Sequence, residues 1–91
     1  MAVSVLIPTP LHGLTGGVDT VELEAETVDN LLQGLDDRYP GLRSRMRMPN
    51  GSWNRFVNIY VNGEDIRFLQ SGETPLTGGE EVSIVMASAG G

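Results

Sequence analysis

The sequence predicts an α+β fold in which a mixed sheet of about five strands packs on one main helix. Short runs rich in β-branched residues stand on both sides of one amphipathic helical segment, and turn residues separate them. The chain has 91 residues, which is enough for one small domain with a single core. One helix on one sheet is the smallest layered arrangement that buries a helical stripe and one sheet face.

Two strands are expected before the helix. Residues 3–7 are rich in β-branched side chains and end at a proline, which indicates a strand that the proline terminates. A loop that contains the Thr-Gly-Gly segment 15–17 follows. Within residues 18–25, Val21 and Leu23 fall on one face and polar residues alternate with them. This pattern predicts a half-buried second strand that pairs with the first as a hairpin.

The helix is the most regular element of the sequence. Thr27 occupies the N-cap position, and Pro40 sets the end near residues 37–39, because proline disfavours helical geometry in the residue before it. The apolar positions that repeat at helical spacing are Val28, Leu31, Leu32 and Leu35. The apolar residues of segment 41–54 show no regular helical or strand spacing. Trp53 in this segment is expected to pack on the core or its edge.

Three further strands are expected after the helix. Residues 55–61 are rich in β-branched and aromatic side chains and precede the turn signal Asn62-Gly63, so they are predicted to form the central strand. Residues 66–69 predict a short fourth strand and residues 82–86 a fifth. The order strand, strand, helix, strand, strand, strand predicts a β-grasp, or ubiquitin-like, fold.

The predicted core combines the helical stripe with the inward face of each strand. It comprises Val3, Val5, Ile7, Val21, Leu23, Val28, Leu31, Leu32, Leu35, Val57, Ile59, Val61, Val82, Ile84 and Met86. Leu6 and Val85 are out of phase with this set, and Phe68 lies on the short fourth strand, so these three side chains could form an exposed docking patch. Ordinary surface exposure is the equal alternative, because single exposed apolar residues are common.

Composition excludes several kinds of site. The chain has no cysteine, so it can form no disulfide, thiolate metal site or cysteine nucleophile. Its only histidine, His12, has no neighbouring carboxylate cluster and is expected to be solvated, so neither a metal nor a bound cofactor is predicted. The net charge of −6 disfavours nucleic acid as a partner. No apolar run approaches the roughly 20 residues of a membrane helix, so no membrane partner and a cytoplasmic location are expected.

The last five residues of the chain are all small. They predict a division into a domain of residues 1–86 and a flexible tail of residues 87–91. Fully extended, such a tail reaches roughly 17 Å, far enough to enter the active site of a partner. Glycine has no Cβ and can pass through a narrow channel, although a frayed chain end is the simpler alternative. The tail comprises Ala87, Ser88, Ala89, Gly90 and Gly91.

The internal pairs Gly16-Gly17 and Gly78-Gly79 have no free carboxylate, and turn formation accounts for both. The terminal pair is different, since Gly91 can present its carboxylate to an enzyme. On the segments that follow, the chain resembles the ThiS and MoaD family of ubiquitin-like sulfur carriers over essentially its whole length. These segments are Ala89-Gly90-Gly91, residues 56–62 with residues 65–68, and residues 76–82. Within the family, residues 15–17, 55–62 and 65–68 are most similar to CysO, the carrier of a cysteine synthase.

The resemblance implies a reaction at the carboxylate of Gly91. An E1-like enzyme of the MoeB, ThiF or MoeZ type would use ATP and magnesium to adenylate it, and a sulfur source would then displace AMP to leave a thiocarboxylate. The carrier would be a cosubstrate and not an enzyme. The implied sulfur acceptor is a PLP-dependent cysteine synthase, after which a zinc-dependent JAMM-type peptidase would regenerate the carrier.

Other acceptors and functions stay open at this point. The acceptor could equally be a molybdopterin synthase partner, a thiazole-forming enzyme or an enzyme of specialised metabolism. An activated Gly91 could also be joined to lysines of target proteins, as in ubiquitin-like modifiers. In a third alternative, the β-grasp body binds a partner without covalent chemistry, and the tail has no role.

Overall fold

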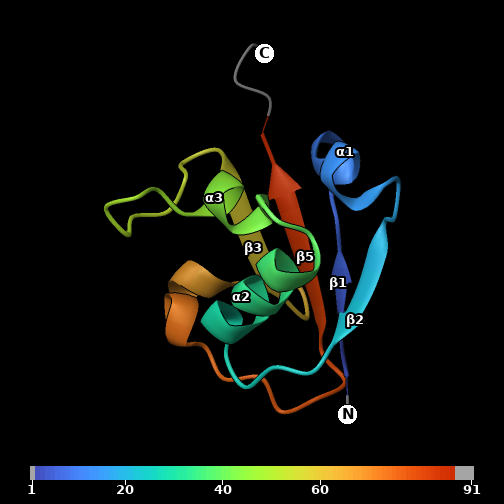
Figure 1. Ribbon diagram of the computed structural model, residues 1–91. Coiled ribbons are helices and arrows are strands. Elements are labelled where there is room, and N and C mark those ends of the chain that lie inside the picture. Colours follow the sequence, from blue (N-terminus) through green and yellow to red (C-terminus); the bar gives the residue numbers. More distant parts are fainter. Residues whose placement is uncertain (1, 88–91) are drawn as a thin grey trace.

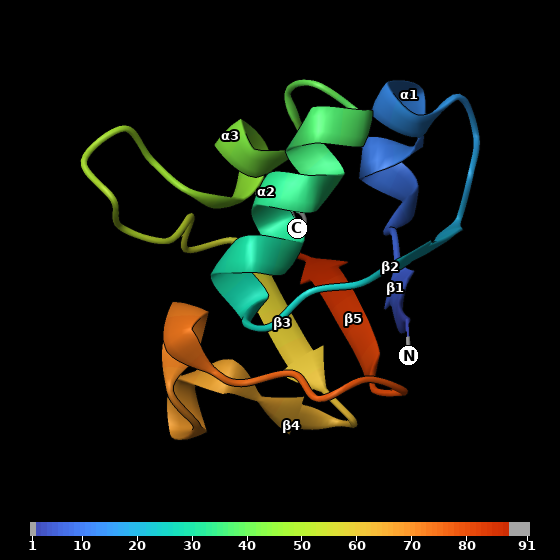
Figure 2. The ribbon, with the colours of Figure 1, turned by 60° about the horizontal axis from the view of Figure 1, so that its bottom comes forward.

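A five-stranded mixed sheet with one long helix across one face forms the body of the protein (Figures 1 and 2). The computed structural model describes residues 2–87. In chain order the elements are β1 (Val3–Leu6), η1 (Thr9–Leu11), α1 (His12–Thr15), β2 (Thr20–Leu23), α2 (Val28–Arg38), α3 (Leu42–Met46), β3 (Val57–Val61), β4 (Glu64–Asp65), η2 (Ile66–Phe68), η3 (Ser71–Glu73) and β5 (Glu81–Met86). The strands lie in the order β2-β1-β5-β3-β4, with β1 parallel to β5 and the other pairs antiparallel. This arrangement confirms the predicted β-grasp fold.

Helix α2 forms as the sequence predicts. The Thr27 side chain accepts a hydrogen bond of 3.1 Å from the backbone N–H of Asn30, which satisfies one of the free donors of the first turn. Asp29 in the same turn adds favourable charge at the positive end of the helix dipole. The helix ends at Arg38, before Pro40, and its apolar stripe is fully buried.

Two predictions about the strands are wrong. The central strand is β5, because β1 and β3 pair on either side of it, while β3 lies next to the edge strand. The β-branched composition of residues 55–61 correctly indicates a strand, but pairing partners are not encoded locally. Residues 66–69 do not form a strand. Asp65 accepts a hydrogen bond of 2.8 Å from the Arg67 N–H, and this cap ends β4 and starts the 3₁₀ turn η2.

Most of the predicted core is buried as expected. The exceptions are Leu23 and Met86, which are half-buried and pack against its margin. The core also contains residues that the sequence did not indicate, because they lie in short helices and loops where apolar residues show no regular spacing. These are Leu11, Leu42, Met46, Ile66 and Leu76.

The loop after α3 is tied to the body through Arg47. Its guanidinium forms an ion pair of 2.7 Å with Asp29 and lies 3.9 Å from the centroid of the Trp53 ring. The Trp53 indole N–H donates to the Ser71 hydroxyl at 2.8 Å. Gly72 packs directly against the ion pair. Trp53 is thus half-buried at the edge of the core, which confirms its prediction.

Candidate functional site

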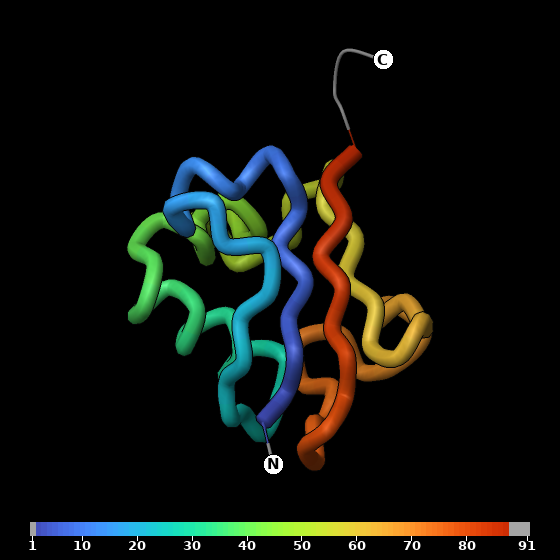
Figure 3. The backbone as a smooth tube through the Cα atoms, turned by 90° about the vertical axis from the view of Figure 1, so that its right-hand side faces the viewer, coloured from blue at the N-terminus to red at the C-terminus, as the bar shows by residue number. Residues whose placement is uncertain are grey.

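The candidate site begins where the chain leaves the central strand. β5 lies between β1 and β3 (Figure 3), with Glu81–Ser83 paired to β1 on one side and Val82–Met86 paired to β3 on the other. The antiparallel ladder continues one residue past the strand, because the Ala87 N–H donates to the Phe56 carbonyl at 2.7 Å. The start of the C-terminal segment is therefore fixed relative to the sheet. The sequence did not single out Phe56, since a backbone carbonyl leaves no side-chain signal.

The predicted reactive group and most of the predicted tail lie outside the described residues. These are Ser88, Ala89, Gly90 and Gly91. Ala87 is described, and it is exposed although its N–H is paired. The boundary between a domain of residues 1–86 and a tail of residues 87–91 stays a prediction.

A tight turn sets the start of β5. Gly78 and Gly79 have φ angles of 113° and 85°, which glycine adopts without strain. The Glu80 carboxylate accepts hydrogen bonds of 2.7 Å from the backbone N–H groups of Thr77 and Gly78. The bond from Thr77 is the main cause that lowers the pKa of Glu80 below its ordinary value. The turn interpretation of both internal glycine pairs is confirmed, since Gly16-Gly17 also has positive φ angles.

The three residues of the predicted docking patch do not all lie together. Leu6 pairs with Ser83, so Val85 is its diagonal neighbour on the solvent face of the sheet. Leu6 is 37% exposed and Val85 45% exposed. Phe68 is 82% exposed, but it belongs to η2, which follows β4, and β5 and β3 lie between β4 and β1. Leu6 and Val85 thus form a pair, while Phe68 is a separate exposed side chain.

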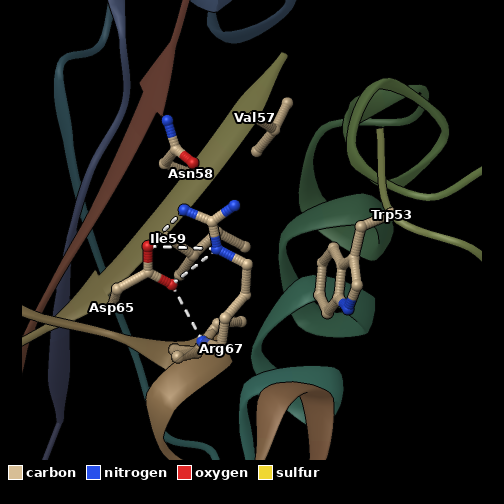
Figure 4. Close-up of a pocket in the computed structure, with 7 residues that line it drawn as sticks. Trp53, Val57, Asn58, Ile59, Asp65 and Arg67 are labelled. Atoms are coloured by element: carbon tan, nitrogen blue, oxygen red, sulfur yellow. Dashed lines mark hydrogen bonds and ion pairs between the residues drawn. The ribbon is translucent and has the colours of Figure 1, made fainter. Parts of the chain in front are cut away.

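A small hollow lies beside the ion pair of Asp65 and Arg67 (Figure 4). The Arg67 guanidinium approaches the Asp65 carboxylate to 2.6 Å, and this side-chain hydrogen bond is the main cause that lowers the pKa of Asp65. The volume of the hollow is about 30 Å³. That space suits about one water molecule, so the hollow cannot hold a metabolite. Its lining residues are Trp53, Val57, Asn58, Ile59, Asp65, Ile66 and Arg67.

Metal ligands do not gather in the part of the chain that the structure describes, where no group of three or more His, Asp or Glu side chains could hold an ion. The prediction for His12 needs correction. Its Nε2 lies 2.9 Å from the carbonyl of Ile7, the residue after β1, so the half-buried ring ties the start of α1 to the end of that strand and is not simply solvated. Across residues 2–87, no helix has the length and apolar character needed to cross a membrane.

The strand order, the single long helix and the exit of the chain from the central strand define a ubiquitin-like β-grasp protein. The sequence profile of the ThiS family matches residues 5–91. The sulfur carrier protein CysO of Mycobacterium tuberculosis is 41% identical over 93 residues, and the alignment covers 100% of both chains. The chain therefore belongs to the ThiS family, as a small sulfur carrier similar to CysO over its whole length.

Solved structures agree with this assignment. CysO in the BexX/CysO complex of Amycolatopsis orientalis is 38% identical with a TM-score of 0.91, covering 99% of this chain and 100% of that one. Small archaeal modifier protein 1 of Methanosarcina acetivorans is 28% identical with a TM-score of 0.83, covering 99% and 96% of the two chains. The relatives thus include sulfur carriers and ubiquitin-like modifiers.

Proposed function

We propose that the C-terminal carboxylate of Gly91 is the group that carries sulfur. The observation that supports this most strongly is the full-length similarity to the sulfur carrier CysO, together with the diglycine at residues 90–91 of this chain. The absence of cysteine from the sequence adds to it, because no side-chain thiol is available to hold a persulfide. The carbonyl carbon of Gly91 is then the place where sulfur is bound.

The carboxylate must first be activated, because a carboxylate is a poor electrophile. One oxygen of Gly91 attacks the α-phosphate of ATP on an E1-like enzyme, and magnesium pyrophosphate leaves. A sulfide donor then attacks the carbonyl carbon of the acyl adenylate and displaces AMP. The product is a thiocarboxylate, a nucleophilic sulfur that docking delivers to its acceptor.

A fixed starting point for the tail favours this mechanism. Ala87 is hydrogen-bonded to Phe56 at the end of the central strand, so a docked body defines where the tail begins. Four further residues, fully extended, span roughly 14 Å. The globular body can therefore stay at the entrance of an active site while Gly91 reaches the reacting groups.

The sulfur acceptor in this proposal is a PLP-dependent cysteine synthase. The thiocarboxylate attacks an aminoacrylate on that enzyme, an acyl shift leaves cysteine in amide linkage to Gly91, and a zinc-dependent JAMM-type peptidase hydrolyses the amide. The CysO of Amycolatopsis orientalis is found in a complex with BexX, which supports docking of the carrier body onto a partner protein. Since the cycle needs ATP, we place it in the cytoplasm, with Leu6, Val85 and Phe68 as candidate docking residues.

Protein modification is the second candidate function. The likeness to small archaeal modifier protein 1 favours it, since the two functions need the same activated carboxylate. The products differ, however. A modifier forms an amide with a target lysine and becomes part of a larger chain, whereas a carrier returns to its original mass after each cycle.

Intact mass spectrometry tests the proposal. The purified chain is incubated with ATP, magnesium, sulfide and an E1-like enzyme, with a Gly91-deleted chain as the control. Exchange of oxygen for sulfur has the same nominal mass change as oxidation of one of the four methionines, so the change must be located at Gly91 or trapped by thiol alkylation. An unchanged terminus with an enzyme that activates CysO would refute the proposal.

A further inference from the structure

The positive charge of the chain is concentrated in one segment. Five of the six cationic side chains, all arginines, lie within residues 38–55, and this segment contains no Asp or Glu. The whole chain has a net charge of −6, so the remaining residues are strongly acidic. Such a separation of charge indicates a surface that attracts a partner of the opposite sign.

Three of these arginines, Arg43, Arg45 and Arg55, are exposed and without an ion pair in the described part of the chain, residues 2–87. Arg47 differs, because it is paired with Asp29 and stacked on an aromatic ring. Exposed charges of this kind contribute little to stability, so their accumulation favours a role in binding.

Two of the exposed arginines adjoin the point where the chain leaves the sheet. The Asn54 side chain donates to the Arg45 carbonyl at 3.0 Å, which joins the end of α3 to the residue before Arg55. One residue further on, the Phe56 carbonyl accepts the 2.7 Å hydrogen bond from Ala87. Figures 1 and 3 show α3 and the loop after it at the end of the sheet where β5 terminates.

An open hollow of about 380 Å³ lies at the same place. Most of its lining is apolar, and the Arg55 guanidinium at its margin is 5.0 Å from the centroid of the Phe56 ring. The base of the C-terminal segment thus combines a shallow apolar depression with cationic side chains. The lining residues are Met48, Trp53, Asn54, Arg55 and Phe56.

We propose that Arg45 and Arg55, with Arg43 at the margin, dock onto an acidic protein surface that borders the channel receiving the C-terminal tail. This rests on the proposed function, which requires that the tail enter such a channel. We take the partner to be a protein because a small acidic area on its surface is enough to match the few arginines that lie beside the start of the tail. Extended polyanions are disfavoured, since the acidic remainder of the molecule would repel them. Contact here would speed encounter with the activating enzyme and orient the tail.

Charge reversal tests the proposal. Arg45→Glu and Arg55→Glu are compared with Arg38→Glu, which changes the net charge equally but lies at a residue that reaches the Glu22 carbonyl on the β2 side of the fold. We expect the first two to raise the KM of the E1-like enzyme for the carrier about tenfold at low ionic strength, with kcat unchanged. The difference should shrink as salt is added, because salt screens exposed charges.

Each outcome has a defined meaning. If all three variants have the same KM, the wild-type thiocarboxylate still forms and the fold is intact by thermal melting, the arginine proposal is wrong and the proposed function stands. If the wild-type chain acquires no thiocarboxylate, both fail. Arginine-dependent binding of a single-stranded oligonucleotide, with unchanged KM in all variants, would also overturn the proposal in favour of a nucleic-acid surface.

Discussion

Substitution of Gly72 by alanine should destabilise the fold, although glycine to alanine is the smallest possible enlargement. A Cβ at this position would overlap both the Asp29 carboxylate and the Arg47 guanidinium. Ends of flexible side chains can normally move away at little cost. Here they cannot move freely, because the two groups are paired at 2.7 Å and the guanidinium is also stacked on Trp53.

The magnitude follows from what the displaced guanidinium would lose. The side chains of Arg47 and Asp29 are 20% and 40% exposed, so their ion pair is partly screened and contributes about 0.5–1 kcal/mol. The contact with Trp53 adds about 0.5–1 kcal/mol. We therefore expect Gly72→Ala to lower the free energy of unfolding by about 1–2 kcal/mol, which corresponds to about 4–8 °C in Tm for each kcal/mol in a domain of this size.

Gly34→Ala is the matched control. Gly34 lies inside α2, where a Cβ would stand 3.5 Å from Leu23, an ordinary contact. Alanine favours a helix interior by about 0.5–1 kcal/mol relative to glycine, so this variant should be stabilised. Urea unfolding of both variants measures the difference. If Gly72→Ala is as stable as the wild type, or if removal of Arg47 does not reduce its effect, the reasoning is wrong.

Three other predictions concern the helix cap, the turn before β5 and the sheet face. Thr27→Ala should lower the free energy of unfolding by about 1 kcal/mol in urea titrations, because it removes the acceptor for the Asn30 N–H. Glu80 has a lowered pKa in the folded state, so it stabilises the fold above the ordinary pKa of an unfolded glutamate, and this contribution is lost as pH falls through the lowered value. Thermal melts of Glu80→Gln should therefore depend less on pH in that acidic range. The double variant Leu6→Arg, Val85→Arg should raise the KM for activation and leave Tm within about 3 °C, because both side chains are exposed.

Different results would contradict each of these. Thr27→Ala with wild-type stability would show that the cap is replaced by water. An acid transition that is equally steep in Glu80→Gln would remove the role of this carboxylate. An unchanged KM in the Leu6 and Val85 variant would exclude the solvent face of the sheet as a docking surface for the activating enzyme.

Local chemistry made part of this fold predictable. The cap at Thr27 and the helical spacing of its apolar residues are determined within one segment, and α2 forms as predicted. The place of β5 at the centre of the sheet depends on pairing with β1, about 80 residues earlier, and neither strand contains that information alone. The 3₁₀ turn at Ile66–Phe68 does have a local signal, because Asp65 stands directly before it and Asp side chains accept hydrogen bonds from nearby backbone N–H groups.

The same distinction applies to the candidate site. A diglycine at the chain end is visible in the sequence, whereas the hydrogen bond from Ala87 to Phe56 that fixes its starting point is not. Leu6 and Val85 could be placed on one face from strand phase alone, but Phe68 could not, since its segment is not a strand. The arginine concentration in residues 38–55 is readable from the sequence, and only its position beside β5 needed the structure.

The proposed chemistry requires the C-terminal tail, which follows β5, to become ordered in a channel of the partner. Fixing the backbone of each tail residue in a channel costs about 1–2 kcal/mol. Glycine lies at the high end of that range because it has the most freedom to lose. Contacts between the globular domain and the partner must offset this cost, because the two glycines have no side-chain heavy atoms that a channel could bind. β3 pairs with β5 up to Met86, and the Ala87 N–H is bonded to the Phe56 carbonyl, so the sheet defines the direction in which the tail begins. In the function we propose, specific activation of Gly91 would therefore depend on docking surfaces around the end of β5, where Val85, Arg45 and Arg55 are located.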